Sequence, residues 1–153
     1  MTQEDPSNLY LNTLTLIEET EERLYFHKAE SSLLVASWKD ISRNDLTLEK
    51  YKQNVMRLVE LLEIYKPKYI LVDCRKLGFE MTDADHRWYI NNSKATWEKA
   101  RIKKIAFVFK ENLSAQAAME SLQDVALEEN GPILHYRIFE NNMDAASWLT
   151  GSK

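Results

Sequence analysis

The sequence predicts an α/β protein with a single mixed β-sheet, in which antiparallel N-terminal strands precede parallel β-α-β units with packed helices. Three observations lead to this prediction. The N-terminal part contains short segments with the composition of strands. The rest of the chain alternates amphipathic helical segments with short apolar runs. Two of these runs, 69–72 and 105–109, are apolar throughout, which is typical of strands buried on both faces of a sheet.

Length and composition indicate one domain. The chain has 153 residues, of which 44% are hydrophobic and 29% are charged, and this suits a single sizeable core. We expect a loose tail over residues 1–8 and one domain over residues 9–150. The formal net charge of -4 gives no general attraction for nucleic acid. A single cysteine, the lack of an export signal and the lack of a run of about 20 apolar residues predict a cytoplasmic protein without a transmembrane segment.

The first strands are predicted from alternating patterns separated by polar residues. Residues 9–17 follow a pleated pattern, and the acidic run 18–22 is expected to end this strand. Strand-like composition returns at 24–27 and again at 32–38. We therefore expect two or three antiparallel strands before the first helix.

The later elements are predicted from helical spacing and from breakers. Thr47 is placed to cap a helix that Pro67 ends, and Asn141 or Asn142 is placed to cap the last helix. A further helix that opens at Ser114 is expected to end at the Asn-Gly-Pro sequence of residues 130–132. The remaining expected elements are a helix over residues 83–101 and strands over 69–72, 105–109 and 133–139.

The carboxyl end of the strand at 69–72 is the predicted functional place. In open α/β sheets, ligands and partners bind at the carboxyl ends of strands, and we take Asp73 to mark the switch point of this sheet. Arg75 and Lys76 follow, and they would stand with Asp73 at the mouth of a ligand pocket if the protein had one. Cys74 is expected to be a buried and unreactive thiol.

The helix after this strand is the predicted contact surface. Thr82 is placed as its N-cap, and acidic residues in the first turn complement the helix dipole. Trp88 and Trp97 are nine positions apart and therefore lie on opposite sides of a straight helix. Since both cannot face one sheet, one of them is expected to meet the next helix, a pocket or a partner subunit. The predicted interaction surface consists of Asp83, Asp85, His86, Trp88 and Tyr89.

No catalytic group and no metal site can be assembled from the sequence. Asp85 and His86 are adjacent on a helix and point about 100° apart, so they do not converge on one ion. The chain has only three glycines, which argues against a glycine-rich loop around a phosphate. We therefore predict a protein without enzymatic activity and without a cofactor.

Three phrases carry a family resemblance. They are the strand Tyr69-Ile-Leu-Val-Asp73 before a helix, the segment Lys103-Lys-Ile-Ala-Phe-Val108, and the ending from Arg137 to Leu149. With the expected order β-β-α-β-α-β-α-β-α, the chain resembles the SpoIIAA-like group of STAS domains, which is itself similar to the CRAL/TRIO lipid-transfer fold. The resemblance extends from Leu9 to Leu149 and implies a STAS-like architecture.

The resemblance also draws attention to Thr82. STAS domains of the anti-sigma antagonist type carry Asp-Ser-Ser-Gly at the start of the helix after the central strand, where phosphorylation of a serine controls partner binding. The matching residues here are Met81-Thr82-Asp83-Ala84. Thr82 keeps a hydroxyl at the phosphoacceptor position, but the leading acid and the glycine are missing, and the nearby carboxylates would oppose a phosphate.

Together, these observations predict a non-enzymatic, STAS-like regulatory domain that acts by binding a protein partner, with a homodimer as one form. The alternative is a carrier or sensor of a small apolar, lipid-like ligand. The similarity to lipid-transfer proteins and the content of Trp, Tyr, Phe and Met favour this alternative. A pocket lined by such side chains would distinguish it from the interaction domain.

Overall fold

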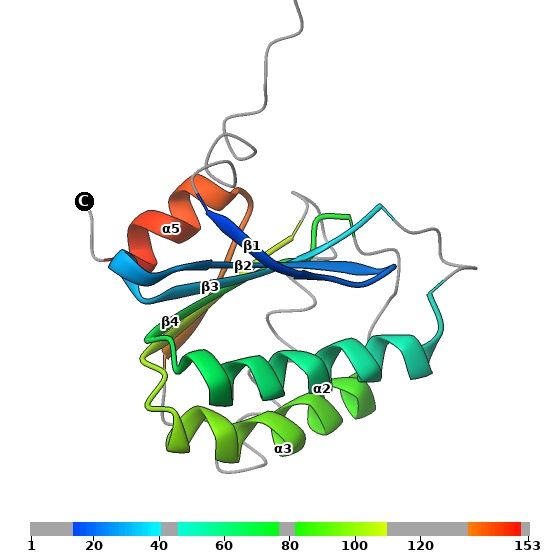
Figure 1. The fold of residues 1–153 in the computed structure, drawn as a ribbon. Coiled ribbons are helices and arrows are strands. Elements are labelled where there is room, and N and C mark those ends of the chain that lie inside the picture. Colours follow the sequence, from blue (N-terminus) through cyan, green and yellow to red (C-terminus); the bar gives the residue numbers. More distant parts are fainter. Residues whose placement is uncertain (1–13, 41–45, 77–81, 110–134, 151–153) are drawn as a thin grey trace, which may run out of the picture.

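A computed structural model of the chain describes residues 14–40, 46–76, 82–109 and 135–150 (Figure 1). The described strands form one six-stranded sheet in which they lie side by side in chain order. These strands are β1 (Thr15–Glu19), β2 (Arg23–Lys28), β3 (Leu33–Trp38), β4 (Tyr69–Asp73), β5 (Lys104–Val108) and β6 (His135–Phe139). The expected tail at residues 1–8 and the helix expected from Ser114 lie outside the described residues.

The sheet is mixed, as predicted. β1, β2 and β3 pair antiparallel, and β3, β4, β5 and β6 pair parallel. A short 3-10 turn, η1 (Ala29–Ser31), connects β2 to β3. The predicted change from antiparallel hairpins to parallel β-α-β units is therefore confirmed.

The end of β1 differs from the prediction. The acidic run was expected to end the strand, but β1 includes Glu18 and Glu19. Glu18 forms an ion pair with Arg57 of the first long helix, and Glu19 pairs with Lys39 just after β3. These partners come from segments distant in sequence. They allow the two glutamates to remain in a strand, although the local acidic sequence does not favour a strand.

The helices cover both faces of the sheet (Figure 1). α2 (Leu48–Tyr65) and α3 (Asp83–Lys99) lie side by side on one face, whereas α5 (Asn142–Thr150) lies on the other. The Thr47 hydroxyl accepts a hydrogen bond from the Lys50 N–H, which confirms the predicted cap of α2. α2 ends with Lys66 in the left-handed region, directly before Pro67. Asn141, and not Asn142, caps α5, because its side chain accepts from the Asp144 N–H.

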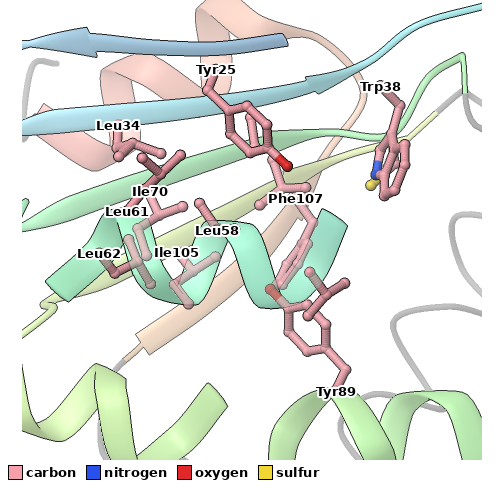
Figure 2. Packing of buried hydrophobic residues seen from close by; sticks show 14 of the residues in the cluster. Tyr25, Leu34, Trp38, Leu58, Leu61, Leu62, Ile70, Tyr89, Ile105 and Phe107 are labelled. Atoms are coloured by element: carbon pink, nitrogen blue, oxygen red, sulfur yellow. The ribbon is translucent and has the colours of Figure 1, made fainter. Parts of the chain in front are cut away.

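Two apolar clusters follow from this arrangement. Along β4, Ile70 and Val72 join the cluster beneath α2 and α3, and Leu71 joins the cluster beneath α5. This alternation confirms that β4 is buried on both faces. Figure 2 shows the larger cluster, where leucines of α2 and Tyr89 of α3 meet side chains of the sheet. Each fully buried aliphatic side chain stabilises the folded state by roughly 1.5–3 kcal/mol relative to an exposed one.

The order of the strands corrects the expected switch point. A switch point requires the strand order to reverse, but the described strands run from β1 to β6 without reversal. The end of β4 nevertheless lies between helices of opposite faces. α3 follows β4 on one face, and α5 packs against β4 from the other.

Candidate functional site

Three polar side chains meet at the carboxyl end of β4. Asp73 is buried, and its carboxylate accepts from Arg75 twice, at 3.0 Å from Nε and at 2.8 Å from Nη2. The Arg75 backbone N–H also donates to Asp73 at 3.1 Å. Asn142, the first residue of α5, donates its Nδ2 to the same carboxylate at 3.2 Å. This cluster ties the end of β4 to a helix 69 residues further along the chain.

The cluster acts as a structural clamp on the end of β4 and not as the open mouth of a ligand pocket. Asp73 and its guanidinium partner occupy each other in a bidentate pair, which fixes both side chains. Lys76 is exposed beside them. Asn142 is fully buried, and its Oδ1 atom has no hydrogen-bond partner among the described residues. The sequence predicts Asp73, Arg75 and Lys76 together, but it does not predict the contact of Asn142 with Asp73, because nothing local links Asn142 to β4.

The start of α3 is fixed by a reciprocal capping box. The Thr82 hydroxyl accepts from the Asp85 N–H at 3.2 Å, and the Asp85 carboxylate accepts from the Thr82 N–H at 3.0 Å. The predicted capping role of Thr82 is confirmed. Thr82 is exposed, and the Asp85 carboxylate stands next to it. Asp83 is the first residue of α3, and its side chain lies outside the described part of the structure.

Two residues of the predicted interaction surface turn inward instead. His86 and Tyr89 are buried, with 3% and 7% of their surface exposed. The Tyr89 ring lies 5.8 Å from Trp97 and 6.2 Å from Phe107 of β5. Burial raises the pKa of the Tyr89 hydroxyl well above its ordinary value of 10.0. His86 and Tyr89 therefore offer no surface to a partner in this structure, because they are buried on the side of α3 that carries Trp97.

Trp88 is about 180° around α3 from Trp97, as its spacing predicts, and it packs against the edge of the same apolar cluster. It is half-buried, and Lys52 of α2 lies over its ring with Nζ 5.0 Å from the ring centre. Leu48 and Met56 lie one turn before and after Lys52 on the same face of α2, and both are exposed. We call Leu48, Lys52, Met56 and Trp88 the α2–α3 patch. Trp88 thus meets the neighbouring helix and still presents surface to solvent.

An open hollow lies on the α2 side of this patch. It has a volume of about 620 Å³ and is lined by Leu48, Glu49, Lys52, Gln53 and Met56. All five lining residues belong to α2, and none belongs to the predicted pocket mouth at Asp73, Arg75 and Lys76. The hollow is therefore a surface feature of the patch and not the interior pocket that the carrier alternative requires.

Cys74 is buried at the end of β4, as predicted. Burial raises the pKa of its thiol from 9.0 to about 12, so the thiol is protonated at neutral pH. Among the described residues, no three histidine, cysteine or acidic side chains lie close enough together to hold a metal ion.

The largest feature that sequence analysis missed is a buried polar network under α2. Its centre is Asn54, whose side-chain carbonyl accepts from Thr20 at 2.8 Å and from Tyr25 at 3.1 Å. Its Nδ2 donates to Glu22 at 2.9 Å. The sequence offers one signal for this network: Arg23 and Tyr25 are two residues apart and therefore share a face of β2. This signal can be used only when the boundaries of the strand are known.

Comparison with known proteins adds no family: no protein-family model, no curated protein and no solved structure matches the chain. In the described part of the chain, no helix combines the length and the apolar character that crossing a bilayer requires. The resemblance to SpoIIAA-like STAS domains consequently stays a prediction.

Proposed function

We propose that the chain is a non-enzymatic, STAS-like regulatory domain of the cytoplasm that binds a partner protein through the α2–α3 patch. The observation that carries this proposal is Trp88, which is half-buried at the edge of the larger apolar cluster with Lys52 over its ring, while Trp97 is buried within that cluster. A large aromatic side chain with two apolar neighbours is the usual composition of an interface anchor.

The patch also indicates the chemistry of the partner. Lys52 lies on the Trp88 ring and forms no ion pair with any described residue. A carboxylate on the partner would therefore be able to pair with the Lys52 ammonium group beside an apolar surface. We expect the partner to present an apolar side chain to Trp88 and Met56, with an acidic residue next to it.

The hollow beside the patch suits a protein partner better than a small apolar ligand. Pockets that hold small molecules enclose most of the ligand surface. Here, the hollow is lined along one helix and is open to solvent. The carrier alternative depends on an enclosed apolar cavity behind Asp73, Arg75 and Lys76, and the clamp at Asp73 offers no support for one.

The polar groups at the end of β4 also favour a non-enzymatic role. Asp73 is engaged with Arg75 and Asn142, and the Cys74 thiol is protonated at neutral pH. Neither group has the partners that activate a base or a nucleophile.

The proposal is tested by a direct binding measurement. Wild type, Trp88→Ala and Ile64→Ala are purified from the native host, and the protein that copurifies in stoichiometric amount is purified separately. Ile64 is the matched control, because it is an apolar residue of α2 with 65% of its surface exposed.

We expect Trp88→Ala to weaken the affinity by at least about tenfold and Ile64→Ala to leave it unchanged. The partner can be a second copy of the chain or a different protein, and calorimetry or sedimentation measures either. Equal affinities of Trp88→Ala and wild type would remove the α2–α3 patch from the proposal. A wild-type chain with neither self-association nor a stoichiometric partner would overturn the proposed function.

A further inference from the structure

Arg23 has an unusual environment for a charged side chain. It begins β2, and 1% of its surface is exposed. The carbon atom at the centre of its guanidinium lies 4.3 Å from the centre of the Trp38 ring and 5.5 Å from that of Tyr25. The sheet produces this arrangement, because Arg23 is directly opposite Trp38 in the β2–β3 pair and two residues from Tyr25 on the same face.

At least one hydrogen-bond donor of this guanidinium, the Nε–H group, is unused among the described residues. The guanidinium offers five N–H donors. Nη1 donates to the backbone carbonyl of Asn54 at 3.3 Å, and Nε is buried without an acceptor in the part of the chain that the structure describes. No carboxylate of a described residue forms an ion pair with Arg23. A buried charge without a counter-charge is costly, and aromatic rings recover only part of the cost.

The neighbouring polar groups do not supply the counter-charge, because they bind one another. The Tyr25 hydroxyl shares its one proton between the Asn54 backbone carbonyl at 3.0 Å and the Asn54 Oδ1 at 3.1 Å. The Glu22 carboxylate, which precedes Arg23 in the chain, accepts from the Asn54 Nδ2 at 2.9 Å. Thr20 donates to the Asn54 Oδ1. Arg23 also hydrogen-bonds to the Tyr25 hydroxyl. The network is thus satisfied around Asn54, whereas the Nε–H donor of Arg23 has no acceptor and its positive charge has no carboxylate partner among the described residues.

We propose that Arg23 anchors a binding site for the carboxylate or phosphate group of a small anionic ligand. Two oxygens of such a group match the planar fork of N–H donors on a guanidinium. The stack on Trp38 holds this fork in one orientation before the ligand binds. Because Arg23 is almost completely buried, the ligand enters by local opening at the start of β2. Binding then stabilises the folded state.

The test compares anions on the full chain. The probes are inorganic phosphate and benzoate, each measured against chloride at equal ionic strength. The readouts are the thermal midpoint and the NMR signal of the Arg23 Nε–Hε group, which is assigned by its loss in Arg23→Lys. The variants are Arg23→Met, which removes the charge and the donors, and Arg57→Met. Arg57 is the matched control, because it is an arginine that already has a carboxylate partner, Glu18.

At least one of the two anions should shift the Arg23 Nε–Hε signal of the wild type in a saturable manner. The same anion should raise the thermal midpoint by about 3–5 °C at about ten times its dissociation constant. Arg23→Met should lose this rise, and Arg57→Met should keep it. The anion that binds identifies the group as phosphate or carboxylate.

An Arg23 signal that neither anion moves would overturn the proposal, and so would an equal rise in the midpoint of Arg23→Met. If Arg23→Met does not fold, the wild-type signal alone decides. Trp88→Ala should keep the anion response, so failure of this site and failure of the α2–α3 patch can be told apart.

Discussion

Asn54 shows how a single buried amide can fix the position of a hairpin on a helix. It joins Thr20, Glu22 and Tyr25, which come from the turn between β1 and β2 and from β2 itself, to the middle of α2. All of these partners are at least 29 residues away in the sequence. Buried polar groups must find partners, and here one side chain satisfies three of them.

Asn54→Ala should lower the free energy of unfolding by about 1–3 kcal/mol, because Thr20, Glu22 and Tyr25 would each lose a partner. Gln53→Ala, at an exposed neighbouring position, should change it by less than about 0.5 kcal/mol. Urea unfolding measures both. A loss no larger in Asn54→Ala than in Gln53→Ala would show that the network does not stabilise the fold.

The buried thiol and phenols predict a loss of stability at alkaline pH. Burial raises the pKa values of Cys74, Tyr25, Tyr51 and Tyr89 in the folded state. These groups ionise first in the unfolded chain, which is then favoured as the pH rises. The urea midpoint should therefore fall between about pH 9 and pH 12, and Cys74→Ala should show a shallower fall. A midpoint that is constant over this range would contradict the assigned burial.

Single residues could be predicted where the cause is local. Thr47 and Thr82 precede helical patterns and were identified as caps. The opposition of Trp88 and Trp97 follows from helical geometry alone. The contact of Asn142 with Asp73 and the environment of Arg23 could not be predicted, because they are set by contacts between distant segments and by strand register.

At the scale of elements, α3 both packs into the core and offers a surface to a partner. The sequence predicted only in part which residues do which. Tyr89 and Trp97 are buried in the larger apolar cluster, and Trp88 is half-buried at its edge, beneath Lys52 of α2. The predicted interaction surface was chosen from the position of this helix after β4, and it combined half-buried Trp88 with buried His86 and Tyr89. Helical geometry places Tyr89 about 100° from Trp88, which explains why one is buried and the other is not.

The capping box should control how firmly α3 begins. Thr82→Ala should lower the free energy of unfolding by about 1 kcal/mol, whereas Thr82→Ser should keep the bond to the Asp85 N–H and change little. Thermal and urea unfolding of the three proteins measure this difference. If Thr82→Ala were as stable as wild type, the box would not contribute to folding, and the hydroxyl would be available for another role.

At the scale of the whole molecule, the direction of the chain across the sheet decides which helices share a face. β3 to β4 and β4 to β5 are successive parallel crossovers in the same direction. Right-handed crossovers place their helices on the same side, as observed for α2 and α3. α5 follows the last strand and is free to cover the opposite face. The class of the fold could be predicted from hydrophobic patterns, but the strand order could not, because several orders satisfy the same patterns.

The central claim, that this domain works by binding a protein through Trp88, is tested most directly by native mass spectrometry of freshly purified protein from its own host. We predict a complex with a second protein chain, identical or different, for the wild type and a monomer for Trp88→Ala. A wild-type monomer that carries a small apolar molecule and no protein would contradict the account and would favour the carrier alternative.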